Sequence, residues 1–246
     1  NMALKYNVPI TAIYKHITES DYLINYSSKD FQYIIGNPPW GYEFSEDEKS
    51  KLRVLYKSAS GKNIESYDVF IEQALNHLAV NGHLTYVLPE AILNIKAHTE
   101  IRKIIIENCC IKNLDFLGNA FDGVQCPSII LDLQCTHSAL STLGMNVNTS
   151  TESFTINTER TVNSEYFSFT TSDAEYNVMN KIRNISNASY LLGNADFALG
   201  IVTGNNKKYI SDKKNNENEM VLKGADISKY HINPTTNYII FKPESF

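Results

Sequence analysis

The first half of the chain alternates between short apolar runs and stretches with helical periodicity. Runs typical of strands lie at Phe31–Gly36, His83–Leu88, Ile111–Leu117 and Ser128–Gln134. The Tyr33-Ile34-Ile35 run has no polar alternation, which predicts a strand covered on both faces. This order of elements predicts an α/β domain with a mainly parallel sheet. Because a short loop joins the last two strands, we expect them to pair antiparallel at one edge.

Three helices are expected between these strands. The clearest is marked by apolar residues at helical spacing, namely Phe70, Ala74, Leu75 and Leu78. Ser66 is placed to cap its start, and Asn81-Gly82 is typical of a helix end. The other two are predicted over Glu46–Ser58, within a polar segment that resembles a loop over a site, and over Thr99–Glu107.

The second half has a different composition. Residues Ser138–Ser164 are rich in Ser, Thr and Asn, which indicates edge strands or a linker. A helix is expected at Asp173–Ile185, and short apolar pieces between Gly and Asn turns follow from Leu191. We therefore expect an α/β domain over residues 1–165, a linker helix over 166–190 and a β-rich domain over 191–246. The last is too short for an independent core, so we expect it to be incomplete.

The composition limits the classes of protein to which the chain can belong. It has 246 residues, 43% hydrophobic and 20% charged, as in ordinary globular domains, and no run long enough to span a membrane. The net charge of −5 argues against a general nucleic-acid binder, although the field that steers binding is local. The four cysteines form no C-x-x-C pair and no His cluster has metal-ligand spacing, so we predict reduced thiols, a cytoplasmic location and no metal.

The most informative segment is Asn37-Pro38-Pro39-Trp40, here called the NPPW turn, which follows the first strand. The two prolines have no N–H and a fixed φ, so the backbone after Asn37 is stiff and its carbonyls lack local partners. Asn37 adds a side-chain acceptor, and Trp40 adds a flat π surface. Two fixed acceptors beside an aromatic plane are suited to hold the exocyclic amino group of a planar base.

The sequence around this turn resembles the adenine-N6-specific DNA methyltransferases of type II restriction-modification systems that have a C-terminal target-recognition domain. Asp21-Tyr22-Leu23 begins sixteen positions before Asn37, as expected in that family. Further matches are Phe70, Asn81-Gly82-His83, Val87-Leu88-Pro89, Asn119-Ala120-Phe121, Pro127-Ser128-Ile129-Ile130, and the segments starting at Gly200 and Leu222. The resemblance implies a partial Rossmann-like, S-adenosylmethionine-dependent methyltransferase domain, followed by the start of a β-rich target-recognition domain.

The resemblance also implies roles for individual residues. Asn37 and the Pro38 carbonyl would accept the two hydrogens of adenine N6, within the rigid turn that Pro39 completes. Trp40 would stack on one face of a base flipped out of double-stranded DNA, and Phe121 would contact the other. Asp21, Tyr22 and Phe70 would hold the adenine of S-adenosylmethionine. In the second domain, a polar basic turn would contact DNA through Thr203, Asn205, Lys207 and Lys208.

One departure from the family pattern is plain: no G-x-G occurs in the 246 residues. We therefore expect the chain to be a fragment that begins after the Gly-rich cofactor loop, to bind S-adenosylmethionine weakly by itself and to be inactive in isolation. A fused or associated restriction nuclease is compatible with the resemblance. Two alternatives stay open: an NPP-aromatic methylase of protein glutamine or RNA, and a non-catalytic DNA-specificity subunit with a relic of the methylase fold.

Overall fold

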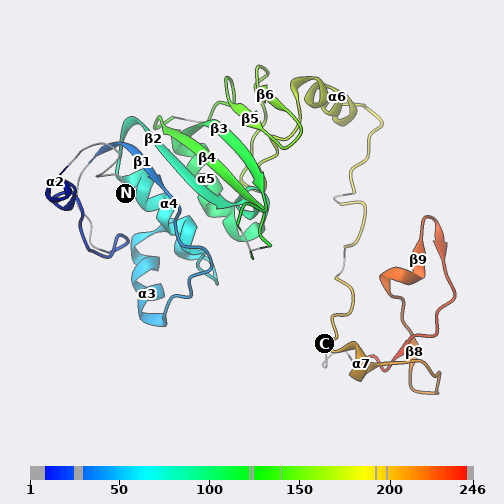
Figure 1. The fold of residues 1–246 in the computed structure, drawn as a ribbon. Coiled ribbons are helices and arrows are strands. Elements are labelled where there is room, and N and C mark those ends of the chain that lie inside the picture. Colours follow the sequence, from blue (N-terminus) through cyan, green and yellow to red (C-terminus); the bar gives the residue numbers. More distant parts are fainter. Residues whose placement is uncertain are drawn as a thin grey trace. The chain divides into compact units, whose positions relative to one another are not determined.

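The computed structural model describes residues 9–24, 30–121, 123, 125–138, 140–191, 193–197 and 199–242. The chain forms two compact units, Asn1–Ile185 and Ser186–Phe246. Figure 1 shows the first unit as a twisted sheet with helices packed on it. No helix in the described part of the chain is long and apolar enough to cross a membrane.

The first unit is built on a six-stranded mixed sheet in the order β1-β2-β4-β3-β5-β6. The strands are β1 (Phe31–Gly36), β2 (Leu78–Pro89), β3 (Cys109–Gly118), β4 (Ser128–Cys135), β5 (Asn146–Asn148) and β6 (Ser153–Thr155). β1 pairs with β2 and β3 pairs with β5 in parallel, while the other three pairings are antiparallel. The four long strands that the apolar runs predicted are all present. β5 and β6 lie in the segment expected to form edge strands or a linker, and β6 is at the edge of the sheet.

The position of β4 differs from the expectation. β3 and β4 do pair antiparallel, but β4 lies between β3 and β2 rather than at an edge. Seven consecutive pairs, from His83↔Gln134 to Pro89↔Ser128, join β4 to β2. A strand paired on both sides leaves no row of unbonded backbone groups, whereas an edge strand would leave one. The sheet is therefore mixed rather than mainly parallel.

The expectation for β1 is also wrong in one respect. Its Ile34 packs against the core, but the neighbouring Tyr33 and Ile35 are 73% and 79% exposed. Successive side chains of a strand point to opposite faces, and here only the Ile34 face is covered. The continuous apolar run therefore forms an edge strand with one covered face.

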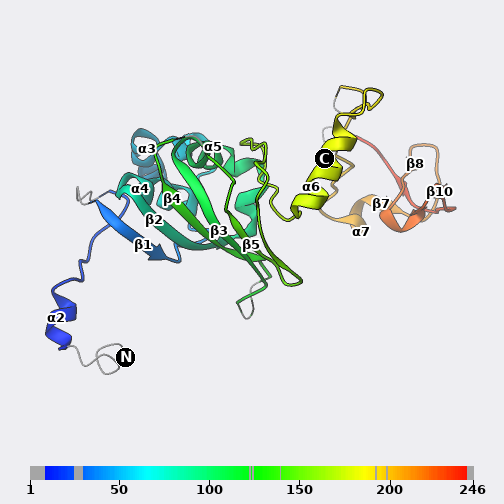
Figure 2. The same ribbon diagram turned by 90° about the horizontal axis from the view of Figure 1, so that it is seen from above.

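Three helical segments lie on one side of this sheet, as Figure 2 shows: α3 (Glu46–Leu55), α4 (Ser66–Asn76) and α5 (Thr99–Asn108). A short 3₁₀ turn, η1 (Lys57–Ser60), joins α3 to the segment before α4. Buried Ile71, Leu75, Ile101 and Ile105 pack against Leu84, Leu114 and Leu131 of the strands. This apolar contact explains why the predicted periodicity produces helices.

The ends of α4 correct the expected caps. Ser66 is the first helical residue, and its side chain does not cap the helix; the residue at the cap is Glu65. The helix ends at Asn76, so Leu78 and Asn81-Gly82 belong to β2. A Cβ on Gly82 would lie 2.8 Å from the Phe31 carbonyl oxygen. Gly82 is thus required by the close approach of β2 to β1 and not by a helix end.

The remaining described elements of this unit are α2 (Ile10–Tyr14), η2 (Glu90–Leu93), η3 (Lys96–His98) and α6 (Asp173–Arg183). α6 confirms the helix expected at Asp173–Ile185 and begins with a capping box between Ser172 and Glu175. None of its residues is buried.

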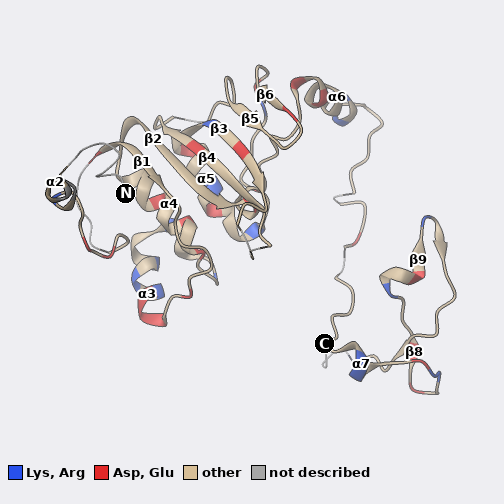
Figure 3. Cartoon of the chain, in the orientation of Figure 1, with Lys and Arg blue, Asp and Glu red and all other residues tan. Residues whose placement is uncertain are grey.

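The second unit consists of short elements: α7 (Asn206–Tyr209), β7 (Ile210–Ser211), β8 (Glu219–Met220), η4 (Gly224–Asp226), β9 (Ile227–Ser228), β10 (His231–Ile232) and β11 (Tyr238–Ile239). They form one three-stranded and one two-stranded sheet. Residues 186–246 contain seven Lys and six Asp or Glu, so the acidity of the chain lies in the first unit. Figure 3 shows basic residues, coloured blue, on α7.

Candidate active site

The NPPW turn directly follows β1, at the carboxyl end of that strand. In α/β sheets, ligands bind at this end of the strands. Asn37 is exposed, Pro38 is buried and Trp40 is half-buried. The Ser66 hydroxyl donates a 2.6 Å hydrogen bond to the Pro39 carbonyl, which ties the turn to the start of α4.

A cavity of about 430 Å³ opens beside this turn. Its lining is mainly aromatic and aliphatic, with Asn37 and Pro38 among the lining residues: Tyr22, Phe31, Tyr33, Ile34, Ile35, Gly36, Asn37, Pro38, Phe70 and Tyr86. The rings of Tyr22 and Phe70 stack with centroids 5.6 Å apart and planes at 30°. Burial raises the pKa of Tyr22 to about 12, so its hydroxyl stays neutral at physiological pH. The cavity thus brings together four residues singled out from the sequence: Tyr22, Asn37, Pro38 and Phe70.

Asp21 has a different place. Its Oδ1 accepts a 2.9 Å hydrogen bond from the Leu23 N–H, and it is not among the cavity-lining residues. Two longer-range hydrogen bonds hold the Asp21-Tyr22-Leu23 segment. The Tyr56 hydroxyl donates to the Leu23 carbonyl (2.6 Å), and Gln73 Nε2 donates to the Tyr22 carbonyl (3.0 Å). One oxygen of Asp21 therefore stabilises the local turn that presents Tyr22.

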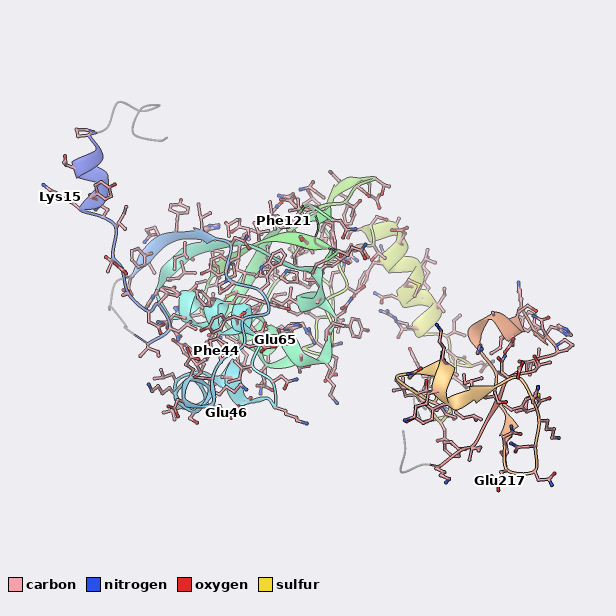
Figure 4. All side chains as sticks on the ribbon, turned by 60° about the horizontal axis from the view of Figure 1, so that its bottom comes forward. Lys15, Phe44, Glu46, Glu65, Phe121 and Glu217 are labelled. Carbon is pink, nitrogen blue, oxygen red and sulfur yellow. The ribbon has the colours of Figure 1, made fainter. Side chains whose placement is uncertain are left out.

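Trp40 and Phe121 form a second aromatic group. Their ring centroids are 5.4 Å apart with planes at 82°, an edge-to-face contact. Trp40 also packs against the main core, while Phe121, labelled in Figure 4, is 39% exposed just beyond β3. Trp40 Nε1 is buried and has no hydrogen-bond partner within the described part of the chain. The two residues expected on opposite faces of a base are therefore in direct contact.

Sequence reasoning missed Tyr86, which lines the cavity from β2. Tyr86 of β2 pairs with Gly36 of β1, and a Cβ on Gly36 would lie 3.3 Å from Tyr86 Cε1. A larger residue would press on this ring, so Gly36 allows the close approach. Nothing local in the sequence indicates Tyr86, because the contact depends on the register between two strands.

A buried polar group next to the turn was also missed. Tyr67 Oη and His98 Nε2 are 2.8 Å apart, and His98 Nδ1 lies 2.9 Å from Asp68 Oδ2. Burial raises the pKa of Asp68 to about 6, against the opposing effect of its hydrogen bond to His98. Tyr67 and Asp68 follow Ser66, so the first turn of α4 is anchored on both the NPPW turn and η3. Only the fold brings His98 to this place.

The residues expected to contact DNA lie in the second unit. The Thr203 hydroxyl donates to Asn206 Oδ1 (2.5 Å), and Asn205 Oδ1 accepts from the Lys208 N–H (3.2 Å) and caps α7. Lys208 Nζ lies 4.9 Å from the centroid of the Tyr209 ring, and Lys207 is exposed. They form one compact basic turn. Across the described residues, no group of three or more His, Cys, Asp or Glu side chains is placed to hold a metal ion.

Comparison with known proteins gives the family. Residues 6–121 match the model of the Eco57I restriction-modification methylase. The chain is 31% identical over 201 residues to the type II methyltransferase M.VspI of Vibrio sp. (strain 343), covering 81% of this chain and 48% of that protein. It is 26% identical over 226 residues to the type II restriction enzyme and methyltransferase RM.Eco57I of Escherichia coli, covering 85% of this chain and 22% of that protein.

Among solved structures, a putative class I S-adenosylmethionine-dependent methyltransferase from Listeria monocytogenes aligns with a TM-score of 0.40 and 21% identity, over 50% of this chain and 39% of that one. The M protein of the type I restriction enzyme EcoKI aligns with a TM-score of 0.35 and 16% identity, over 49% of this chain and 25% of that one. The chain spans about half the length of M.VspI and 22% of RM.Eco57I. From the sequence matches, residues 6–121 belong to the Eco57I restriction-modification methylase family.

Proposed function

We propose that the protein containing this chain transfers a methyl group from S-adenosylmethionine to N6 of an adenine flipped out of a specific DNA sequence. The observation that carries the proposal is the NPPW turn at the carboxyl end of β1, with Asn37 and Pro38 on the wall of an aromatic cavity. The relatives support the same class of activity, since their names describe type II methyltransferases.

The turn would act by holding the amino group of the target base. Asn37 Oδ1 and the Pro38 carbonyl accept its two hydrogens, which turns the N6 lone pair out of conjugation and toward an electrophilic methyl group. No covalent enzyme intermediate is needed, so catalysis consists of positioning and electrostatic stabilisation. The two consecutive Pro residues keep these acceptors fixed before the base arrives.

The aromatic pair would stabilise the flipped base. Unstacking a base costs a few kcal/mol. Stacking on aromatic side chains returns about 1–3 kcal/mol per base. Trp40 offers one ring face, and Phe121 offers a second ring on the other side of the base once their mutual contact opens.

The cavity residues fit the adenine part of S-adenosylmethionine. Tyr22 and Phe70 already stack on one another and form an apolar wall suited to a planar ring, and Asp21 would accept from its amino group through the oxygen that Leu23 does not use. Bound there, S-adenosylmethionine supplies the electrophilic methyl group. The lining also includes Asn37, so one cavity would serve cofactor and acceptor.

Recognition of the DNA sequence is assigned to the second unit. We propose residues 1–165 as catalytic domain, 166–190 as linker helix and 191–246 as part of the target-recognition domain. Thr203, Asn205, Lys207 and Lys208 offer donors and positive charge in one turn, as contacts to phosphates and base edges require. A restriction activity in the same protein or in a partner is compatible with the name of RM.Eco57I.

The test is a methyl-transfer assay with the full-length protein, DNA and labelled S-adenosylmethionine, with the product nucleoside identified by mass spectrometry. We expect N6-methyladenine, and we expect Asn37→Ala to lower kcat by about 100-fold or more, the scale of a lost transition-state hydrogen-bonding group. The exposed Asn187→Ala is the control. Full activity of Asn37→Ala, or methyl groups found only on cytosine, RNA or protein glutamine, would refute the proposal.

A further inference from the structure

α4 makes a side-chain bond to the NPPW turn at its first residue. Ser66 is fully buried, and its hydroxyl donates to the Pro39 carbonyl at 2.6 Å. Pro38 and Pro39 have no N–H, so neighbouring backbone cannot fix the turn by accepting from them. The Ser66 bond therefore supplies an anchor that sets the rotation of the Pro39 peptide and, through it, the direction of the preceding Pro38 carbonyl.

Near its other end, α4 holds the wall of the cavity. Gln73 is 3% exposed, and its Nε2 donates to the Tyr22 carbonyl at 3.0 Å. Between the two anchors, Phe70 stacks on the Tyr22 ring. Gln73 lies seven positions after Ser66, which corresponds to about 10 Å along a helix axis. One continuous helix thus spans from the turn to the cofactor wall.

The helix itself cannot shift easily. Tyr67 and Asp68 both contact buried His98 of η3, and the Glu72 carboxylate accepts from the Lys57 and Ser58 N–H groups at 3.0 and 2.8 Å. Nine of its eleven residues are buried. Any sliding of α4 would break several buried hydrogen bonds at once and leave buried polar groups without partners, which is strongly unfavourable.

We propose that α4 is a rigid spacer that sets the distance between methyl donor and acceptor, with Ser66 and Gln73 as its positioning residues. Ser66 orients the acceptor side through Pro39, and Gln73 orients the donor side through Tyr22. Neither residue touches a reacting atom. This inference rests on the proposed function, because it assigns the cofactor to the Tyr22 wall and the target base to the turn.

The two anchors should affect different kinetic parameters. Loss of the Ser66 bond leaves the cofactor wall intact but loosens the acceptors, which lowers kcat. Loss of the Gln73 bond leaves the turn intact but loosens Tyr22, which raises the KM and Kd for S-adenosylmethionine. A purely structural role would instead lower stability and change all parameters together.

The experiment compares Ser66→Ala, Ser66→Thr and Gln73→Ala in the full-length protein. We expect Ser66→Ala to lower kcat about tenfold, the scale of one buried hydrogen bond, with the KM for S-adenosylmethionine within about twofold of wild type. Ser66→Thr, which keeps the hydroxyl, should restore most of kcat. Gln73→Ala should raise the KM and Kd for S-adenosylmethionine about tenfold while kcat changes less than about threefold.

Two matched controls remove similar side-chain bonds that involve no residue of the NPPW turn. Ser50 Oγ donates to the Glu46 carbonyl and Asn108 Nδ2 donates to the Ile104 carbonyl, each at 2.8 Å. Ser50→Ala and Asn108→Ala should leave kcat and KM unchanged. The same changes of kcat and of the KM for S-adenosylmethionine in Ser66→Ala and Gln73→Ala, or no rescue by Ser66→Thr, would overturn the proposal.

A second readout separates this proposal from the methylation reaction itself. Trp40 is the only tryptophan of the 246 residues and adjoins Pro39, so the emission that is lost in a Trp40→Phe variant of the same protein reports the turn. If the wild-type protein makes no N6-methyladenine, the proposed function fails, but the spacer is still tested. An emission shift in Ser66→Ala with none in Gln73→Ala or Ser50→Ala supports the Ser66 anchor, and unchanged emission refutes it. Calorimetry with S-adenosylmethionine tests Gln73 in the same way.

Discussion

The Trp40 indole and the Phe121 ring meet edge to face, with centroids 5.4 Å apart. A planar base held between two parallel rings needs about 7 Å between them, twice an aromatic contact distance of about 3.5 Å. Phe121 therefore occupies the place beside Trp40 that a flipped base would take in the proposed reaction. Opening this contact is part of base binding under that proposal.

Replacement of Phe121 should weaken base binding. We expect Phe121→Ala to weaken binding of DNA with an unpaired target adenine by about 1–3 kcal/mol, the scale of one stacking contact. Phe121→Tyr, which keeps the ring, should bind within a few-fold of wild type. Titration of Trp40 emission with DNA measures both affinities. Unchanged affinity of Phe121→Ala would show that this ring does not contact the base.

Asp68 should make stability depend on pH. Burial raises its pKa from 3.8 to about 6, so the folded state holds the proton more tightly than the unfolded state. The favourable contribution of Asp68 to the free energy of unfolding is complete below pH 3.8 and is lost as the pH rises through 6. Relative to Asp68→Asn, the wild-type free energy of unfolding should fall by about 1–3 kcal/mol from pH 4 to pH 7.

Denaturant unfolding of both proteins across this pH range measures the effect. His98, Glu65 and Arg102 also influence Asp68, so the difference between the two proteins is compared and not the wild-type curve alone. The exposed Asp47→Asn on α3 is the control and should show no such trend. A pH-independent difference for Asp68→Asn would contradict the assignment.

Gly82 should not tolerate a side chain. A Cβ there would lie 2.8 Å from the Phe31 carbonyl oxygen and 2.9 Å from that of Ala79. Because both neighbours are backbone atoms, we expect Gly82→Ala to lower the free energy of unfolding by about 1–3 kcal/mol. A Cβ on Gly200 would meet no atom of the described residues within 4 Å, so Gly200→Ala is the control. Equal stability of the two variants in denaturant titrations would be inconsistent with this packing.

The basic turn at α7 should determine part of the salt dependence of DNA binding. Each lysine that neutralises a phosphate contributes about 0.9 to the slope of log K against log salt concentration. We therefore expect Lys207→Ala and Lys208→Ala each to reduce the slope by about 1 and to weaken binding uniformly across sequences. Lys49→Ala, which breaks a surface ion pair with Glu46, is the control. An unchanged slope would remove these lysines from the interface.

Much of the local structure was predictable from the sequence. The apolar runs became β1 to β4, and the periodic stretches became α3, α4, α5 and α6, because burial of an apolar face follows from nearby residues alone. The stiffness of the NPPW turn is likewise local, since each proline constrains its own backbone. The motif and its sixteen-residue interval from Asp21 also led to the family that the relatives support.

Strand order and side-chain partners were decided by the tertiary structure. β4 lies between β2 and β3, and Tyr33 and Ile35 are exposed on an edge strand, because pairing depends on residues far apart in sequence. Ser66 is a residue type that favours helix caps, yet its hydroxyl donates a hydrogen bond to the Pro39 carbonyl, twenty-seven residues earlier. A Ser hydroxyl can donate its hydrogen bond to a backbone group nearby in the sequence or to one far away. Only the packing of α4 against the NPPW turn selects the distant partner, and with it the geometry of the site.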